Sequence, residues 1–229
     1  MIDHAASAAT GLRDVFVGSH SKVWQGLSAR LGPGPKRAIG HREIAGFGFT
    51  PQDRVWVLSY SRLPAENAAL LAALRDAGVG EVVYASSSSV IVGSLTACYE
   101  YPRVKQQAER DALVLPNARV LTIGLMYERA EELPAGPVIA TSYDELAAFI
   151  AAPGWPDEAG RRKRLFRLVQ RPFGGATERW AHAAYGRLLR WSGGYPCLLR
   201  PIDLVLRACG MRWYGYVHLS NSLWISTIS

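Results

Sequence analysis

Short apolar segments alternate with helix-patterned segments over the first 150 residues of the chain. Residues 53–58 contain a continuous apolar run, "VWVL", and similar segments occur at 13–17, 36–44, 81–86 and 118–128. Helical patterns occupy 21–31, 64–77 and a segment from Tyr101 or Pro102 to about Leu113. Continuous apolar runs are typical of strands buried on both faces. The alternation therefore predicts an α/β fold with a parallel sheet and helices on both of its faces.

The bulk composition narrows the class of protein. A chain of 229 residues that is 49% hydrophobic is expected to form one globular body. It contains no apolar run of the roughly 18 to 20 residues that a membrane-spanning helix needs, and its beginning does not resemble a signal peptide, so we expect a cytoplasmic protein. The three cysteines and five histidines show neither disulfide-type nor metal-type spacing, so we expect no metal site.

The net charge of +7 is suited to an anionic partner, which includes nucleotides, phosphorylated substrates, nucleic acids and acidic membrane surfaces. No groove-reading or base-stacking motif accompanies this charge, and no nucleic acid is expected as a partner. The net charge alone does not distinguish among nucleotides, phosphorylated substrates and acidic membrane surfaces.

The last 80 residues differ in character from the rest. They contain the basic stretch "RRKRLFRLVQR", little strand pattern and five of the seven tryptophans, namely Trp155, Trp180, Trp191, Trp213 and Trp224. We predict two domains, a Rossmann-like unit at residues 1–150 and a small, mainly helical C-terminal lobe at 151–229.

Chemistry is concentrated after the strand at 81–86. A serine run, "SSSS", follows this strand, and Tyr101 and Lys105 then stand four residues apart on a predicted helix, where they share one face. A lysine ammonium beside a phenol lowers the tyrosine pKa from about 10, which suits the tyrosine to proton transfer near neutral pH. A serine hydroxyl at the strand end could orient an alcohol or a carbonyl, and the three groups together predict an alcohol oxidation site.

The stretch "GVGEVVYASSSSVIVG", followed by "YPRVK", resembles the short-chain dehydrogenase/reductase superfamily, in particular its extended branch that modifies nucleotide sugars. The resemblance covers roughly residues 12 to 150, including "PVIATSYDELAAFI". It implies that Tyr101 exchanges a proton with the substrate, that Lys105 holds the cofactor ribose and tunes Tyr101, and that Ser88 contacts the reacting oxygen. Ser87 is the alternative serine, since the run allows a slip of one residue.

The phosphate-binding turn of this superfamily carries three glycines, and "GSHSKVW" keeps only the first. Gly18 matches the first position, Ser21 stands at the second and could donate to phosphate, and Trp24 stands at the third, where an indole is expected to push the helix off the strand. With an offset of two residues, Gly26 supplies the packing glycine instead.

The segment between the first and fourth strands is short, which predicts that at least one strand and one helix of a full Rossmann sheet are reduced or lost. At the end of the second strand, "GHREI" offers Arg42 where NAD-dependent relatives offer an acidic residue. Arg42 would favour NADP over NAD, or it is a plain surface charge.

The resemblance implies an NAD(P)-dependent oxidoreductase or epimerase that acts on a nucleotide-activated sugar, for example in surface polysaccharide biosynthesis. The alternative is a catalytically inactive Rossmann-like binding or scaffold protein without a dinucleotide. The C-terminal arginines and aromatic residues are predicted to bind the sugar nucleotide, to form a basic surface over a core, or to contact an anionic membrane. A homodimer is expected through an apolar helical face formed by Trp180, Ala184, Leu188 and Trp191, with Arg187 and Arg190 facing outward.

Overall fold

The computed structural model describes residues 12–32, 37–59, 61, 63–152, 155, 160–193, 198, 201–202, 204–205, 208 and 215–228. Its larger sheet has six strands in the order β2-β1-β3-β4-β5-β8, and each neighbouring pair is parallel, as predicted. The strands are β1 (Arg13–Val17), β2 (Arg37–Ile39), β3 (Asp53–Val57), β4 (Glu81–Ser87), β5 (Ala118–Ile123) and β8 (Arg162–Leu165).

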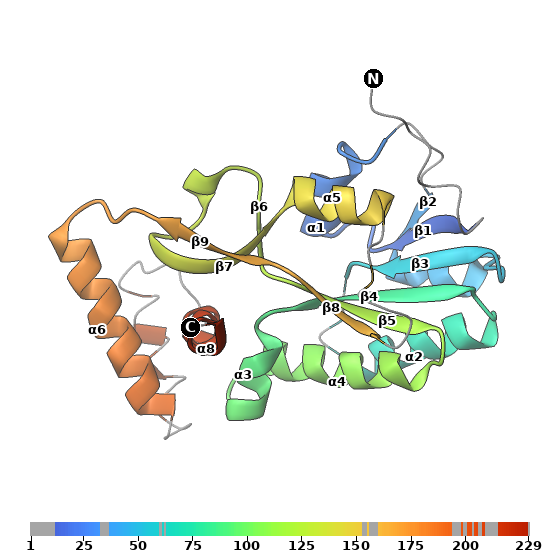
Figure 1. Cartoon of the computed structure of the whole chain (residues 1–229). Helices are drawn as coiled ribbons and strands as arrows, with labels where there is room; N and C mark the ends of the chain where they lie inside the picture. Colours follow the sequence, from blue (N-terminus) through green and yellow to red (C-terminus); the bar gives the residue numbers. More distant parts are fainter. Residues whose placement is uncertain are drawn as a thin grey trace.

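Helices cover both faces of this sheet because successive side chains of each strand point to opposite sides. Val15 and Val17 of β1 pack in one core cluster with α2 (Pro64–Asp76) and α4 (Glu100–Val114). Phe16, between them in sequence, packs in the opposite cluster with α1 (Lys22–Ser28) and α5 (Tyr143–Ala151). Figure 1 shows α1 and α5 over one face and α2 and α4 under the other.

The sheet is shortened on the β2 side, as the sequence predicted. The chain passes from the edge strand β2 to β3 through a single 3-10 helix, η2 (His41–Gly46), with no α-helix or further strand between them. On this side of β1, the described sheet therefore consists of the edge strand β2 alone.

A smaller, three-stranded sheet follows the larger one. It consists of β6 (Leu125–Tyr127), β7 (Gly136–Ser142) and β9 (Arg167–Arg171), in which β9 is antiparallel to β7. The remaining described elements are α3 (Val90–Leu95), the 3-10 helix η3 (Ala130–Glu132), α6 (Ala176–Gly193) and α8 (Gly215–Ile228). The predicted helical character of the C-terminal region is confirmed for α6 and α8, which lie beside the smaller sheet (Figure 1).

The prediction of little strand structure after residue 150 was wrong for the basic stretch, which forms β8 and β9. Both are edge strands, so each needs only one hydrogen-bonding neighbour and can keep arginines in solvent. Exposed and half-buried residues alternate along β8. A strand of this kind lacks the continuous apolar run that predicts a buried strand.

Two of the three cysteines, Cys197 and Cys209, lie outside the described residues, and so does Trp213. Within the described part of the chain, no helix has the length and hydrophobicity needed to cross a bilayer.

Candidate functional site

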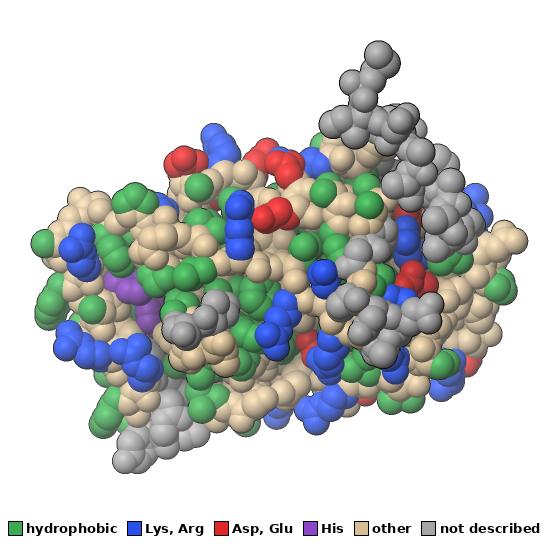
Figure 2. All heavy atoms as spheres, viewed as in Figure 1, with side chains coloured by type: hydrophobic (Ala, Val, Ile, Leu, Met, Phe, Trp, Pro, Cys, Tyr) green, Lys and Arg blue, Asp and Glu red, His purple; other side chains and the backbone are tan. Residues whose placement is uncertain are grey.

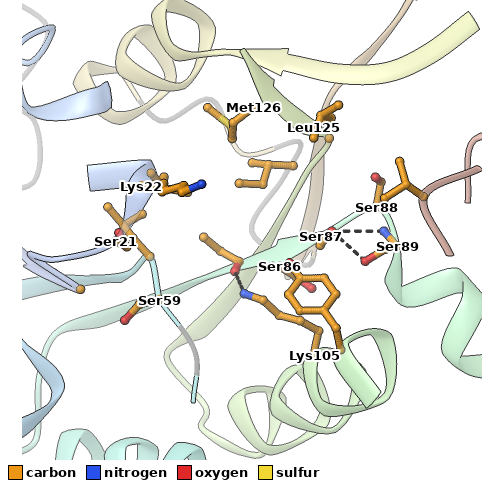
Figure 3. Close-up of a pocket in the computed structure, with 18 of the residues that line it drawn as sticks. Ser21, Lys22, Ser59, Ser86, Ser87, Ser88, Ser89, Lys105, Leu125 and Met126 are labelled. Atoms are coloured by element: carbon orange, nitrogen blue, oxygen red, sulfur yellow. Dashed lines mark hydrogen bonds between the residues drawn. The ribbon is translucent and has the colours of Figure 1, made fainter. Parts of the chain in front are cut away.

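A cavity of about 960 Å³ opens at the carboxyl ends of the parallel strands. In open α/β sheets this edge is where ligands bind, because the strand ends and the following loops converge there. The lining includes every site residue predicted from the sequence, which are Gly18, Ser21, Arg42, Ser88, Tyr101 and Lys105. Figure 3 shows Ser21 and Lys22 on one side of this cavity and the serine run with Lys105 on another.

Gly18 forms the turn that leads from β1 to α1. Its φ of 113° lies in the left-handed region that favours glycine, and a β-carbon on it would lie 2.6 Å from Ser59 Oγ. The N–H groups of Gly18 and Ser19 both donate to the carbonyl oxygen of Ile39, at 2.8 and 3.1 Å. The turn is thus hydrogen-bonded to β2 and packed against Ser59, shortly after the end of β3. Only glycine fits at this position without strain.

Ser21 caps α1, since its Oγ accepts a hydrogen bond from the Trp24 N–H at 3.1 Å. Its hydroxyl hydrogen can still be donated to a ligand. The Trp24 ring packs on Phe16, with ring centroids 4.8 Å apart, and Trp24 is not among the residues that line the cavity. The indole therefore fills space between α1 and the sheet and leaves the cavity open, which the sequence did not suggest.

Gly26 does serve as a packing glycine, but against a different element from the one expected. A β-carbon on Gly26 would lie 2.3 Å from Cζ of Tyr143, the first residue of α5. The close approach is thus between α1 and α5 rather than between α1 and β1.

The residues after β2 form the neighbouring wall. Arg42 is exposed and lines the cavity, and the Glu43 carboxylate accepts the Gly40 N–H at 2.7 Å. His41 Nε2 lies 2.5 Å from Ser59 Oγ, and burial lowers the pKa of His41. This wall therefore presents one cation, Arg42, beside a histidine whose neutral form is favoured.

The serine run begins inside β4 and ends in the turn before α3. The Ser87 hydroxyl oxygen accepts the Ser89 N–H at 3.2 Å and lies 2.9 Å from the Ser89 hydroxyl, as the dashed lines in Figure 3 show. Ser88, which is buried, donates its N–H to the Ile123 carbonyl oxygen at 2.7 Å. The hydroxyl of Ser87, the alternative serine, is therefore already engaged by two hydrogen bonds with Ser89.

Lys105 is buried in α4, with 5% of its surface exposed, and Nζ donates to the Ala85 carbonyl oxygen at 2.8 Å. Its ammonium also lies 4.9 Å from the centre of the Tyr84 ring. Burial lowers the pKa of Lys105 to about 7, against the opposing effect of Glu109 one turn later. Lys105 can thus change its charge near neutral pH.

Tyr101 lies one turn before Lys105 on α4 and is half-buried in the cavity wall. Its ring stacks on Tyr216 of α8, with centroids 5.5 Å apart and planes inclined by 26°. The orientation of Tyr101 therefore depends on a helix that lies more than 100 residues away in the sequence.

Helix α8 supplies a wall that the sequence did not predict. Ser220 Oγ and Trp224 Nε1 both donate to the Ser88 carbonyl oxygen, at 2.9 and 2.7 Å. Asn221, which is buried and lines the cavity, accepts the Ile139 N–H on Oδ1 at 3.1 Å. This bond fixes the orientation of the amide, and its Nδ2 has no hydrogen-bond partner in the described part of the chain.

One prediction gave the C-terminal arginines the role of binding the sugar nucleotide, but no arginine of the described C-terminal residues lines the cavity. The C-terminal residues described in the lining are Tyr216, Val217, Ser220 and Asn221, none of them charged. The available indication of this wall was the polar run "SNS" between apolar residues of the helix "GYVHLSNSLWISTI". Within the described residues, no three His, Cys, Asp or Glu side chains are grouped as metal ligands would be.

No protein-family model matches the sequence, and no curated protein matches it. Solved structures do match in three dimensions. MoeE5 in complex with UDP-glucuronic acid and NAD is 15% identical, with 68% of this chain and 77% of that chain covered and a TM-score of 0.52. A short-chain dehydrogenase/reductase superfamily protein from Agrobacterium tumefaciens with bound NAD is 15% identical, with 75% and 82% covered and a TM-score of 0.51.

A third similar structure is a dTDP-4-dehydrorhamnose reductase from Clostridium acetobutylicum, 11% identical, with 69% and 75% covered and a TM-score of 0.50. At these identities the likeness shows the fold. The Rossmann-like fold expected from the resemblance to the extended short-chain dehydrogenase/reductase branch is thereby confirmed.

Proposed function

We propose that this protein is an NAD(P)-dependent oxidoreductase that acts on a nucleotide-activated sugar, as a reductase or an epimerase. The observation that carries the proposal is the convergence of Ser88, Tyr101 and Lys105 with the Gly18 turn on one cavity at the carboxyl ends of the strands. These residues come from three separate segments of the chain, which the parallel order of β1, β3 and β4 brings to one edge of the sheet.

We assign each side chain the role that the resemblance implies, and the geometry of the cavity supports these assignments. Tyr101 exchanges a proton with the substrate hydroxyl or carbonyl oxygen, and its stack on Tyr216 limits the positions that its phenol can take. Ser88 orients the same oxygen from the turn that follows β4. Lys105 holds the ribose of the cofactor and adjusts the proton affinity of Tyr101, and its pKa of about 7 lets it change charge during turnover. A bound nicotinamide supplies or takes the hydride.

The residues around the turn fit a dinucleotide. Gly18 leaves space for a close approach to the backbone, Ser21 retains a hydroxyl donor, and Trp24 stays out of the cavity lining. Arg42 and Lys22 place positive charge along the lining where phosphate groups would lie. Arg42 supports NADP over NAD, because its guanidinium can pair with the extra phosphate of NADP, whereas the neighbouring Glu43 carboxylate is engaged by the Gly40 N–H.

Two observations support a nucleotide sugar as the substrate class. The structurally similar MoeE5 holds UDP-glucuronic acid beside NAD. In this chain, Asn221 contributes a buried amide donor to the wall next to Ser88, and such a donor suits the hydroxyl-rich surface of a sugar. A role in surface polysaccharide biosynthesis remains a prediction.

The rival proposal is a Rossmann-like scaffold without cofactor. The observations that favour it are the two missing glycines of the turn and the engagement of Lys105 Nζ by the Ala85 carbonyl oxygen. The two proposals differ first in whether the protein binds a dinucleotide.

A titration of the full chain with NADH and with NADPH, followed by nicotinamide fluorescence, separates them. We expect saturable binding, tighter for NADPH, and a loss of about tenfold or more in NADPH affinity in Arg42→Ala with little change for NADH. Tyr101→Phe should bind the cofactor normally and show no turnover of nucleotide sugars. Absence of saturable binding in the wild type would favour the scaffold, and binding restored in Trp24→Gly would show that the indole closes the site after all.

Two partner predictions concern the C-terminal region, a homodimer and a peripheral membrane contact. Both would use the exposed side of α6, and neither is required for the chemistry at the cavity. The expected cytoplasmic location likewise remains a prediction.

A further inference from the structure

Positive charge is concentrated at one end of the sequence. Residues 160–229 contain twelve Lys and Arg against two Asp and Glu, whereas residues 1–159 contain fourteen against seventeen. The positive net charge of the whole chain therefore comes entirely from its C-terminal part. A surface of one charge sign attracts partners of the other sign over roughly a Debye length.

Helix α6 combines this charge with exposed apolar side chains. Trp180 is 67% exposed, Trp191 is 60% exposed and Leu188 is 37% exposed, whereas indoles are usually buried. Arg187 and Arg190 are exposed beside them. Figure 2 shows hydrophobic and Lys or Arg side chains side by side over α6, at the left end of the molecule.

The opposite side of α6 is already occupied. Tyr185 and His182 pack on His218 of α8, with ring centroids 5.1 and 4.8 Å apart. Gly186 permits this approach, since a β-carbon on it would lie 2.7 Å from His218 Nε2. The helix is thus held to the protein by one side and presents Trp180, Arg187 and Trp191 on the other, with the exposed Arg190 at the margin near His218.

A second copy of the chain fits this surface poorly. A two-fold interface places the same patch on both partners, so the exposed Arg187 and Arg190 of the two copies would be brought close together. The one acidic residue of α6, Glu178, already accepts the Gly174 N–H at 2.5 Å. Self-association through α6 would therefore bring like charges together without acidic residues of the same helix to offset them.

A nucleic acid matches the charge and could stack bases on the indoles, but it gives the exposed Leu188 no role. Phosphate contacts use cationic and polar groups, and exposed leucine adds nothing to them. A bilayer interface uses both components, because indoles lie at the headgroup level and arginines pair with lipid phosphate.

We propose that the exposed side of α6, formed by Arg179, Trp180, Arg187, Leu188, Arg190 and Trp191, docks the protein on the surface of an anionic lipid bilayer. This surface lies apart from the cavity, and the proposal does not depend on the proposed enzymatic function. The helix lies in the interface plane and does not cross the bilayer.

The test is sedimentation of the full chain with two kinds of vesicle, pure phosphatidylcholine and phosphatidylcholine mixed with phosphatidylglycerol. We expect binding to the mixed vesicles only, decreasing with added salt. The variant R179Q/R187Q/R190Q should bind on the order of a hundredfold more weakly. The matched control R75Q/R103Q/R129Q removes the same number of exposed arginines elsewhere and should bind almost as the wild type does.

A second variant, W180A/W191A, tests the apolar component, and circular dichroism verifies that it is folded. We expect it to lose most of its vesicle binding while it keeps its helix content. Failure of the wild type to sediment with mixed vesicles, or equal weakening in both arginine variants, would overturn the proposal. A lipid-independent dimer that W180A/W191A abolishes would assign the surface to a second copy, and a DNA or RNA gel shift without vesicle binding would assign it to nucleic acid.

Discussion

Trp224 donates its indole N–H to the main-chain carbonyl oxygen of Ser88 over 2.7 Å, and Ser220, one turn earlier on α8, donates to the same oxygen over 2.9 Å. One turn earlier still, Tyr216 stacks on Tyr101. Three α8 residues at a spacing of four therefore contact Ser88 of the serine run and the candidate proton donor, Tyr101. Helix α8 therefore helps to position the Ser88 backbone and the Tyr101 ring, in addition to lining the cavity.

Trp224→Phe should lower kcat more than it raises KM. The change removes the indole donor and keeps an aromatic ring, so the Ser88 carbonyl oxygen loses one of its two α8 partners. We expect a loss of about 1–2 kcal/mol in stability and a several-fold drop in kcat, with unchanged NAD(P)H affinity. Steady-state kinetics and urea unfolding measure these effects.

Ser226→Ala is the matched control, because Ser226 is exposed on the same helix and donates to Leu223 instead. Equal kinetic losses in Trp224→Phe and Ser226→Ala would mean that the bond to Ser88 does not position the site.

Lys105 should make stability depend on pH. Burial lowers its pKa to about 7 in the folded protein, whereas an unfolded lysine has a pKa of about 10.4. Between these values the unfolded state binds more protons, so the free energy of unfolding rises with pH through this window and levels off above it. Below pH 7 both states are protonated and the penalty for burying the charge is at its largest.

Urea unfolding of the wild type and of Lys105→Met at several pH values between about 7 and 10 tests this prediction. We expect the wild type to gain on the order of a few kcal/mol relative to Lys105→Met across the window. Lys22→Met removes an exposed lysine and should keep the wild-type slope. Identical slopes in the wild type and Lys105→Met would contradict the prediction.

Gly18→Val should remove dinucleotide binding and destabilise the fold. The positive φ disfavours any other residue, and a β-carbon would overlap with Ser59. We expect about 1–3 kcal/mol of lost stability and no measurable NADPH binding in a fluorescence titration. Gly48→Ala is the control, since a β-carbon at Gly48 meets nothing within 4 Å. Normal NADPH affinity in Gly18→Val would show that the turn does not hold the cofactor.

Gly26→Ala should be destabilising only while the Tyr143 ring is present. A β-carbon on Gly26 would overlap with this ring, and the expected cost is about 1–3 kcal/mol. In a Tyr143→Ala background the same change should cost much less, which a double-mutant cycle by urea unfolding measures directly. Additive effects of the two changes would show that α1 and α5 do not approach each other at this point.

The sequence by itself determined the parallel sheet, its helices and the candidate residues of the cavity. These predictions rest on local patterns, since continuous apolar runs identify strands buried on both faces and a spacing of four places Tyr101 and Lys105 on one helix face. Parallel order then brings the carboxyl ends of the strands to one edge. The shortened sheet also followed from chain length alone, because 13 residues between β2 and β3 leave little room for a further helix and strand.

The tertiary structure decided what depends on packing between distant segments. The edge strands β8 and β9 are stabilised by pairing with one neighbour, so their arginine-rich sequence carried no apolar pattern. The direction of the Trp24 ring depended on the space beside Phe16, and the partner of Gly26 depended on where α5 packs. The docking of α8 on Ser88 joins residues 136 positions apart, and no local pattern encodes a contact of that range.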